Sequence, residues 1–226
     1  MSRQTIEVGR DILADRRAAA DRFRAEFARR GVLVVRVVSS PGLGKTALLE
    51  ATARRLGAPG RMAVLVGDIA TDRDARRLAP WAPAVQITTG GACHLELPLV
   101  ERALPGLGDA TFDYLFIEDV GNLVCPASHD LGEHLRVALL STTEGDDKPG
   151  KYPKMFRTSH ALVISKLDLL PYVPFRLEAA MADARAIRSD LEVIPVCALD
   201  GRGIDAWCDY LGGQRQQAIA EERARL

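Results

Sequence analysis

The chain is poor in the residues that define several protein classes. Its 226 residues include four cysteines and four histidines, and aromatic residues make up 5% of the total. Lysine plus arginine equals aspartate plus glutamate at 30 each, so no net charge attracts a polyanion. We therefore expect that nucleic acid is not a partner of this protein.

Long apolar runs are also missing. No stretch approaches the roughly 18 apolar residues of a membrane span, and the first 23 residues are too charged for a signal peptide. We expect a cytoplasmic protein with no membrane partner. Thiols stay reduced in that compartment, which argues against disulfides and leaves packing or chemistry to explain the cysteines. The cysteines are Cys93, Cys125, Cys197 and Cys208.

Short apolar runs alternate with helical patterns along the chain. The segment "VLVVRVV" at 32–38 is typical of a buried strand. Further strands are predicted near 63–67, 84–88, 113–118, 160–165 and 192–197, and in "RVALLST". This alternation predicts an α/β fold with a mostly parallel sheet, helices on both faces, and ligands at the carboxyl ends of the strands. We assign 1–30 to an N-terminal helical extension and 31–226 to one domain.

A phosphate-binding motif follows the first predicted strand. "SSPGLGKT" matches G-x-x-x-x-G-K-[ST], except that Ser39 stands where the first glycine is expected. In such a loop glycines turn backbone amides toward phosphate, Lys45 neutralises the β- and γ-oxygens, and the Thr46 hydroxyl binds Mg²⁺. The segment therefore predicts a P-loop NTPase. Its predicted nucleotide-binding residues are Gly42, Leu43, Gly44, Lys45, Thr46 and Ala47.

Two carboxylates end later strands, where Mg²⁺ would need them. Asp68 ends "AVLVGD", and Glu118 ends "YLFIEDVG", whose E-x-x-G spacing is similar to that of γ-phosphate-sensing switches. We predict Thr46, Asp68 and Glu118 as Mg²⁺ ligands, and Lys45, Asp68 and Glu118 as catalytic residues. The alternative is that each acid is merely solvated at a strand end.

The segment "SKLD" ends another strand and is close to the N-K-x-D motif of guanine-binding proteins. There the carboxylate, here Asp168, accepts two hydrogen bonds that adenine cannot offer, and the stem of Lys166 packs along the base. The motif predicts GTP or GDP as the nucleotide. Ser165 replaces the usual asparagine, so a loop-bracing amide is missing and weaker guanine selectivity or affinity is expected.

A possible metal site lies in "ACHLE" and "GNLVCP". Thiolates and imidazole bind Zn²⁺ or Ni²⁺ well, and Cys93, His94 and Cys125 would leave the shell incomplete, so a second protomer could complete it. Spacing alone does not separate this interpretation from two buried thiols beside an ordinary imidazole. The donor set also does not choose between nickel and zinc.

Six segments together resemble the HypB family of hydrogenase nickel-incorporation GTPases. They are "SSPGLGKTALLE", "GDIATDRDARRL", "TTGGACHLE", "FIEDVGNLVCPASHDLGE", "STTEGDD" and "SKLDLLP", and the resemblance covers roughly 31–210. It implies a slow GTPase of the SIMIBI type that helps insert Ni²⁺ into the large subunit of nickel–iron hydrogenases, together with a zinc-containing chaperone, HypA. It also implies a GTP-dependent homodimer with Cys93, His94 and Cys125 binding Ni²⁺ or Zn²⁺ near the interface.

The chain departs from the family pattern at several positions. Residues 1–30 contain no cysteine or histidine, so we expect no N-terminal nickel site. Asp119 stands where asparagine is usual and should add negative charge beside the metals. "VCALDGRG" replaces the usual Ser-Ala-Lys, which makes Ala198 the predicted base-contacting residue and Cys197 a packing or base-contacting residue. Cys208 is predicted to be core.

The remaining histidines and one loop are weighed separately. His129 lies four residues after Cys125 and is either a fourth ligand or an exposed histidine, whereas His134 and His160 are predicted to be structural. The segment "STTEGDDKPGKYPKM" predicts a mobile surface loop, because its prolines should block helix formation. Lys148 or Lys151 would then reach a nucleotide or carboxylate of a second protomer, unless the loop has no role.

Three alternatives to the hydrogenase assignment remain. A urease nickel-insertion GTPase, UreG, shares the fold but has C-P-H where this chain has "ACHLE". A nucleotide-dependent interaction switch would use its cysteines and histidine only for packing. A small-molecule kinase would need an acceptor pocket, for which no motif is found, and "SKLD" argues against ATP.

Overall fold

A seven-stranded sheet forms the centre of the structure, a computed structural model that describes residues 8–57, 61–69 and 71–225. The strand order is β3-β2-β4-β1-β5-β6-β7, and every pair is parallel. The predicted parallel sheet is confirmed. The strands are β1 Leu33–Val38, β2 Met62–Asp68, β3 Ala84–Thr88, β4 Tyr114–Glu118, β5 Leu135–Ser141, β6 Ala161–Ser165 and β7 Glu192–Pro195.

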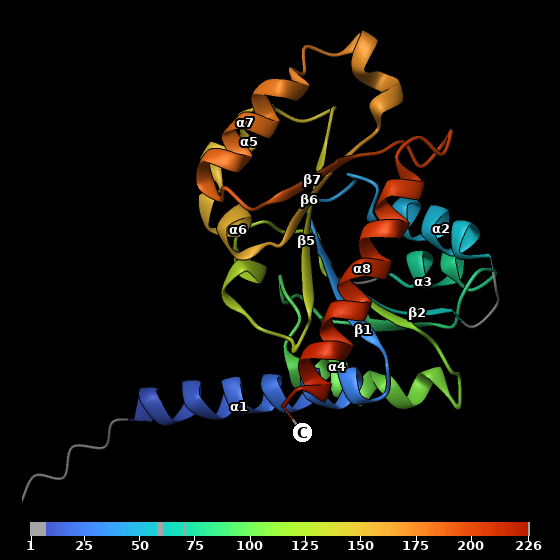
Figure 1. Cartoon of the computed structure of the whole chain (residues 1–226), viewed down its shortest axis with the longest axis vertical. Coiled ribbons are helices and arrows are strands. Elements are labelled where there is room, and N and C mark those ends of the chain that lie inside the picture. Colours follow the sequence, from blue (N-terminus) through green and yellow to red (C-terminus); the bar gives the residue numbers. More distant parts are fainter. Residues whose placement is uncertain (1–7, 58–60, 70, 226) are drawn as a thin grey trace, which may run out of the picture.

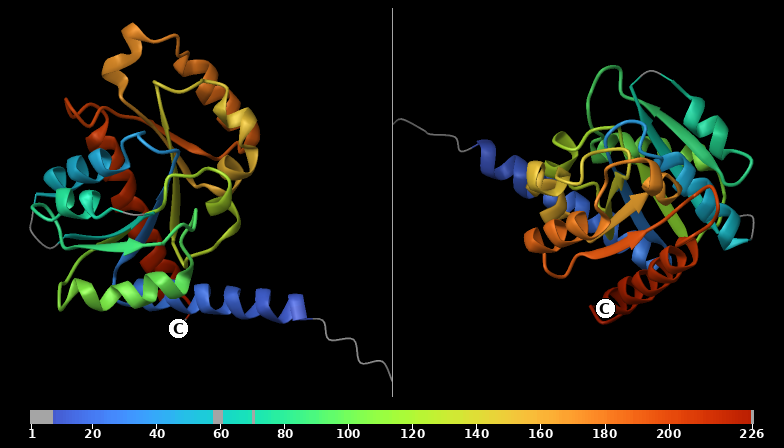
Figure 2. Two further views of the ribbon diagram at one scale, coloured as in Figure 1. Left: turned by 180° about the vertical axis from the view of Figure 1, so that it is seen from behind. Right: turned by 90° about the horizontal axis from the view of Figure 1, so that it is seen from above.

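Helices cover both faces of the sheet, as predicted (Figures 1 and 2). The side chains of α2, α3 and α8 pack on one face, while α1 and α4 cover one half of the other face and α6 and α7 cover its second half. The helices are α1 Val8–Arg29, α2 Lys45–Leu56, α3 Arg73–Leu78, α4 Leu97–Ala103, α5 Lys148–Lys151, α6 Pro153–Thr158, α7 Leu177–Ile187 and α8 Ile204–Arg223, with 3-10 turns η1 Leu104–Leu107, η2 Cys125–Ser128 and η3 Leu167–Tyr172. Within the described ranges, no helix combines the length and hydropathy needed to cross a bilayer.

Helix α1 runs along the base of the domain, and its first turns project beyond the body (Figure 1). Phe23 packs so closely on Gly132 that a Cβ there would lie 2.8 Å from the ring, and Gly132 has a φ of +74°. Arg24 donates to both carboxylate oxygens of Asp130 at 2.9 and 3.0 Å, and to the Glu133 carbonyl at 3.0 Å. The helix is thereby held to the segment that follows η2. Residues 1–7 of the predicted extension lie outside the described residues.

The prediction that prolines prevent a helix in residues 141–155 is wrong. Residues 148–158 form α5 and α6, because proline is tolerated in the first turn of a helix, where its missing N–H costs nothing. Lys148 is paired with Glu144 at 2.9 Å and Lys151 with Asp147 at 2.6 Å, so both lysines already have partners on their own segment. Helix α6 also buries two apolar side chains, Met155 and Phe156, in the core.

Candidate nucleotide and metal sites

The phosphate loop joins β1 to α2. Gly42 and Gly44 have φ values of +75° and +100°, which side chains rarely adopt, and α2 begins at Lys45. The free amides of the first helical turn therefore lie at the end of this loop, where they favour an anion. Ser39, at the position expected to be glycine, is buried and accepts a hydrogen bond from the Lys45 ammonium at 3.2 Å. The serine thus holds the lysine that the motif needs.

A cavity of about 360 Å³ opens beside this loop, and Thr46, Asp68 and Glu118 all line it. The Thr46 hydroxyl donates to Glu118 at 3.0 Å, and Asp68 accepts a hydrogen bond from Thr71 at 2.9 Å. Burial raises the pKa of Glu118 to about 7, although Lys45 acts in the opposite direction. Glu118 is therefore not a solvated strand-end acid. A buried carboxylate of this kind suits a bound cation, so the residues fit the predicted Mg²⁺ site.

The segment after β4 touches the phosphate loop directly. A Cβ on Gly121 would lie 2.8 Å from Pro41 Cγ and 3.0 Å from the Pro41 backbone. Only glycine lets these two backbones approach so closely. A displacement of the phosphate loop at Pro41 would therefore also displace the segment that starts at Glu118, or open this contact.

The base-binding segment is tied to the phosphate loop by two side chains. Lys166 has a φ of +61° and donates from its ammonium to the Gly42 carbonyl at 2.9 Å. The Ser165 hydroxyl donates to the Leu43 carbonyl at 2.7 Å, with the Leu140 carbonyl as a second acceptor at 3.2 Å. The Ser165 hydroxyl thus braces the phosphate loop in place of the missing amide, and the weaker guanine selectivity or affinity stays a prediction.

Asp168, the predicted guanine acceptor, lies in the turn after Lys166. Its carboxylate accepts a hydrogen bond from the Cys197 thiol at 3.2 Å, and Ala198 is half-buried next to that cysteine. The two predicted base-binding segments therefore meet. Burial raises the pKa of Cys197, so this thiol acts as a donor and not as a thiolate. Cys208 belongs to the core beside Trp207, as predicted.

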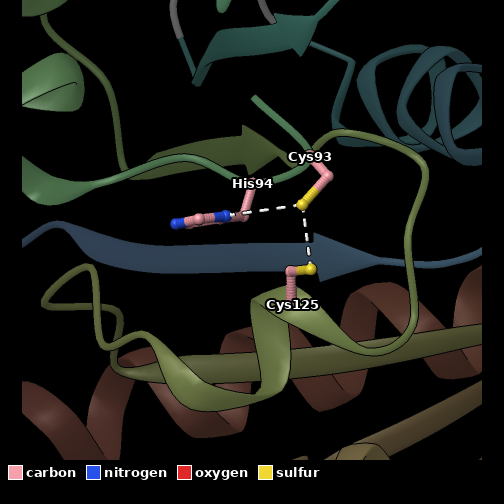
Figure 3. A group of neighbouring side chains, drawn as sticks. All are labelled: Cys93, His94 and Cys125. Carbon is pink, nitrogen blue, oxygen red and sulfur yellow. Dashed lines mark hydrogen bonds between the residues drawn. The ribbon is translucent and has the colours of Figure 1, made fainter. Parts of the chain in front are cut away.

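Cys93, His94 and Cys125 come together from two separate segments, as Figure 3 shows. The Cys93 and Cys125 sulfurs lie 2.8 Å apart, and His94 Nδ1 lies 3.8 Å from the Cys93 sulfur. All three side chains are half-buried. The potential ligand atoms lie within 4.8 Å of one another, which is compatible with a single cation bound by all three. Hydrogen bonding to Cys125 and burial raise the pKa of Cys93, so its thiol stays protonated and donates to the Cys125 sulfur.

The other histidines have distinct positions. His129 is neither exposed nor grouped with the two thiols; its ring stacks on that of His94 with centroids 3.9 Å apart. His134 and His160 accept backbone N–H groups through Nδ1, from Val34 and Arg136, both at 2.9 Å. Burial lowers the pKa of both rings, that of His134 to about 4. Their predicted structural role is confirmed.

The sequence suggested that Asp119 adds negative charge beside the metal sites. This prediction is wrong, because the charge of Asp119 is paired. Both Asp119 and Arg36 are fully buried, and the Arg36 guanidinium donates to the Asp119 carboxylate from two nitrogens. The second Asp119 oxygen accepts from the backbone N–H of Val120 at 2.8 Å and of Leu95 at 3.2 Å. One carboxylate therefore connects β1, the segment after Glu118 and the residue that follows His94.

This ion pair belongs to a larger buried cluster that the sequence interpretation missed. Burial opposes the charge of Glu133, but Arg36 and Arg136 outweigh it and lower the Glu133 pKa to about 2. Both arginines also donate to the His129 carbonyl. The one available signal was the arginine inside the apolar run "VLVVRVV", since a buried charge requires partners.

Comparison with known proteins identifies the family. A family model described as "CobW/HypB/UreG, nucleotide-binding domain" matches residues 33–195. The hydrogenase maturation factor HypB of Escherichia coli strain K12 is 47% identical over 214 residues, which cover 94% of this chain and 74% of that protein. The chain belongs to the HypB family of hydrogenase maturation factors.

Solved HypB structures have the same fold. The crystal structure of HypB from Helicobacter pylori in complex with nickel has a TM-score of 0.84 at 34% identity and covers 91% of this chain and 97% of that one. HypB from Archaeoglobus fulgidus gives a TM-score of 0.81 at 34% identity, over 89% of this chain and 99% of that one. The predicted HypB resemblance and P-loop fold of the SIMIBI type are confirmed.

Proposed function

We propose that this HypB-family chain is a GTP-hydrolysing nickel metallochaperone that helps insert Ni²⁺ into the large subunit of a nickel–iron hydrogenase. One observation carries the proposal. Gly121 packs on Pro41 of the phosphate loop, and Cys125, four positions later, faces Cys93 at 2.8 Å between sulfurs. A segment that touches the nucleotide loop therefore also contributes a thiol to the candidate metal site.

The nucleotide half of the proposal rests on the phosphate and base loops. Gly42, Leu43, Gly44, Lys45, Thr46 and Ala47 would surround the phosphates. Asp168 would accept the hydrogen bonds specific to guanine, beside Lys166 and Ala198. Thr46, Asp68 and Glu118 would hold Mg²⁺, which supplies positive charge to the oxygens of the transferred phosphoryl group. The Lys45 ammonium would add charge at the same oxygens, in keeping with its position at the start of α2.

The metal half rests on Cys93, His94 and Cys125. Two thiolates and an imidazole suit Ni²⁺ as cargo, and they suit Zn²⁺ equally. Three ligands from one chain leave the shell incomplete. A second protomer would complete it, so we propose a homodimer that forms with GTP and places the two metal sites near its interface.

Nucleotide state and metal affinity would be coupled through residues 118–125. Loss of the γ-phosphate would release the contact between this segment and the phosphate loop, and Cys125 would move with it. Metal bound between Cys93 and Cys125 would then lose one thiolate. The nickel complex of the Helicobacter pylori relative supports nickel as the cargo.

The proposed partners follow from family membership. They are a zinc-containing HypA-like chaperone as the nickel source and the hydrogenase large subunit as the acceptor. Urease is a second candidate acceptor pathway, because the 36% identical relative of Helicobacter pylori strain J99 is named a hydrogenase/urease maturation factor. The 47% identical relatives carry the hydrogenase name alone, which favours the hydrogenase pathway.

The first test is a Ni²⁺ titration of metal-free, reduced protein with GDP and with a non-hydrolysable GTP analogue. Thiolate-to-nickel absorption and molecular mass are followed together. We expect a thiolate signal that depends on the nucleotide, saturates with dimer formation and disappears in Cys93→Ala. Cys208→Ala, which removes a core thiol, is the matched control and should leave the signal intact. Equal nickel binding in both nucleotide states would contradict the coupling.

A further inference from the structure

The two ring nitrogens of His94 face different neighbours. Nδ1 lies 3.8 Å from the Cys93 sulfur, whereas Nε2 lies 3.8 Å from the Glu96 carboxylate on the opposite side. His129 stacks on the same ring, with an interplanar angle of 22°. The potential ligand atoms of His94, Glu96 and His129 all lie within 4.8 Å of one another. His94 is therefore a member of two compact groups of metal-binding side chains.

His129 is held as a metal-binding histidine is usually held. Its Nδ1 lies 3.0 Å from the Cys125 carbonyl oxygen, which can only accept, so Nδ1 carries the proton of the neutral ring. This tautomer leaves the Nε2 lone pair available. A hydrogen bond from one ring nitrogen to a carbonyl commonly orients a histidine that binds metal through the other nitrogen. The His129 backbone is itself fixed, because its carbonyl accepts from the buried Arg36 and Arg136.

The second group also has space beside it. A cavity of about 480 Å³ is lined by Glu96 and His129, together with Glu101 and Asp130. Waters in such a cavity can fill the positions that three protein ligands leave open on a divalent cation. Arg16 and Arg17 line the same cavity, and Arg16 lies 3.9 Å from the Glu96 carboxylate, so a bound cation would replace an arginine as the partner of Glu96.

We propose that His94, Glu96 and His129 form a second divalent-metal site with nitrogen and oxygen ligands, next to the thiolate site and sharing His94 with it. Two imidazoles and a carboxylate suit a borderline cation such as Ni²⁺. Because an imidazole lone pair lies in the plane of its ring, binding one cation requires the two rings to turn out of their stacked arrangement. A neutral imidazole has one lone pair, so His94 serves one group at a time and the two sites compete for it. This second site rests on the proposed function, which places nickel at the thiolates. The site with nitrogen and oxygen ligands can still be tested in a protein that lacks the two thiols.

The test uses Ni²⁺ alone, with equilibrium dialysis for affinity and X-ray absorption for the identity of the ligand atoms. The Cys93→Ala/Cys125→Ala variant should still bind one Ni²⁺ per chain, with nitrogen and oxygen neighbours and no sulfur. Adding His129→Phe, which keeps an aromatic ring against His94, should weaken that binding at least tenfold. Adding Glu101→Gln instead, a change in the same cavity but outside the group, should leave it unchanged.

Two results would overturn the second site: no nickel binding by the double cysteine variant, or binding that His129→Phe does not weaken. The single variant His129→Phe separates this question from the proposed function. If it keeps the thiolate-to-nickel absorption while the double cysteine variant binds nothing, the thiolate site stands alone. If wild-type protein shows no thiolate signal while the double cysteine variant binds nickel, the N/O site stands and the thiolate proposal fails.

Discussion

Arg36 and Asp119 form an ion pair in which neither side chain is exposed to solvent. On the same face of β1, Val34 belongs to the apolar cluster under α1 and α4, and Val38 belongs to the cluster under α6 and α7. Arg36 lies between these two valines, so the ion pair separates the two clusters. Through its other oxygen, Asp119 accepts the backbone N–H that follows His94. The pair therefore supports both the core and the position of the candidate metal ligands.

We expect Asp119→Asn to lower the free energy of unfolding by about 3 kcal/mol, since breaking a buried ion pair leaves a charge uncompensated. Glu133, 3.5 Å from Arg36, keeps the loss from being larger. Urea unfolding measures it. Asp190→Asn, which breaks an exposed pair with Arg188, is the control and should cost less than about 1 kcal/mol. Equal losses would mean that burial adds nothing to the pair.

Gly121→Ala should weaken binding of a GTP analogue about tenfold, or roughly 1.4 kcal/mol, and affect GDP less. The added methyl would meet Pro41 within 3 Å and push the segment after β4 away from the phosphate loop. Competition against a fluorescent nucleotide measures both affinities. Gly213→Ala on α8, where an added Cβ meets nothing within 4 Å, is the control. An unchanged ratio of GTP to GDP affinity would show that this contact does not sense the γ-phosphate.

Asp168→Asn should weaken GTP binding by about 2–3 kcal/mol, because the amide offers a donor where guanine needs an acceptor. Xanthosine triphosphate, which has a carbonyl in place of the exocyclic amine, should gain affinity in the same variant. Asp205→Asn changes an exposed acid in the first turn of α8 and should alter neither. If GTP and ATP compete equally with wild-type protein, the guanine assignment of Asp168 is incorrect.

Stability should fall in acid partly because of His134. Its pKa is about 4 in the folded protein, against an ordinary value of 6.5, so the unfolded chain binds a proton that the folded chain excludes. The contribution is fully present above pH 6.5 and is lost as the pH falls toward 4. His134→Gln should therefore show a smaller decrease in unfolding free energy between pH 7 and pH 5 than wild type.

Comparing wild type with His134→Gln at each pH cancels the contributions of the other titrating groups to the unfolding free energy. These include Glu118, whose raised pKa makes its own contribution decrease as the pH rises toward about 7. Parallel pH profiles for wild type and His134→Gln would show that this histidine is protonated equally in both states.

The sequence predicts those parts of the structure whose chemistry is local. The phosphate loop requires glycines at positive φ and a lysine at the start of a helix, and these residues are adjacent in the chain. The parallel sheet follows from alternating patterns in the same way. The proximity of Cys93 to Cys125 was predictable only in outline, since it depends on two loops at the same edge of the sheet.

Other features depend on partners distant in sequence. Arg36 looks like an interruption of an apolar strand until Asp119 and Glu133 are placed beside it, 83 and 97 residues away. Ser165 looks like a lost asparagine until Leu43 supplies a carbonyl 122 residues away. The helices at 148–158 were missed for a different reason, because Pro149 and Pro153 were interpreted as helix breakers when they occupy first turns.

The links from Ser165 to Leu43 and from Lys166 to Gly42 set the distance between the base and phosphate ends of the nucleotide site before any ligand arrives. Such preorganisation reduces the conformational entropy lost on binding. It also separates the part of the nucleotide that provides affinity from the part that distinguishes GTP from GDP. In the proposed GTPase, the base and inner phosphates would meet the same contacts in GTP and GDP, and a difference between the two nucleotides would be sensed at the facing segment that begins at Glu118.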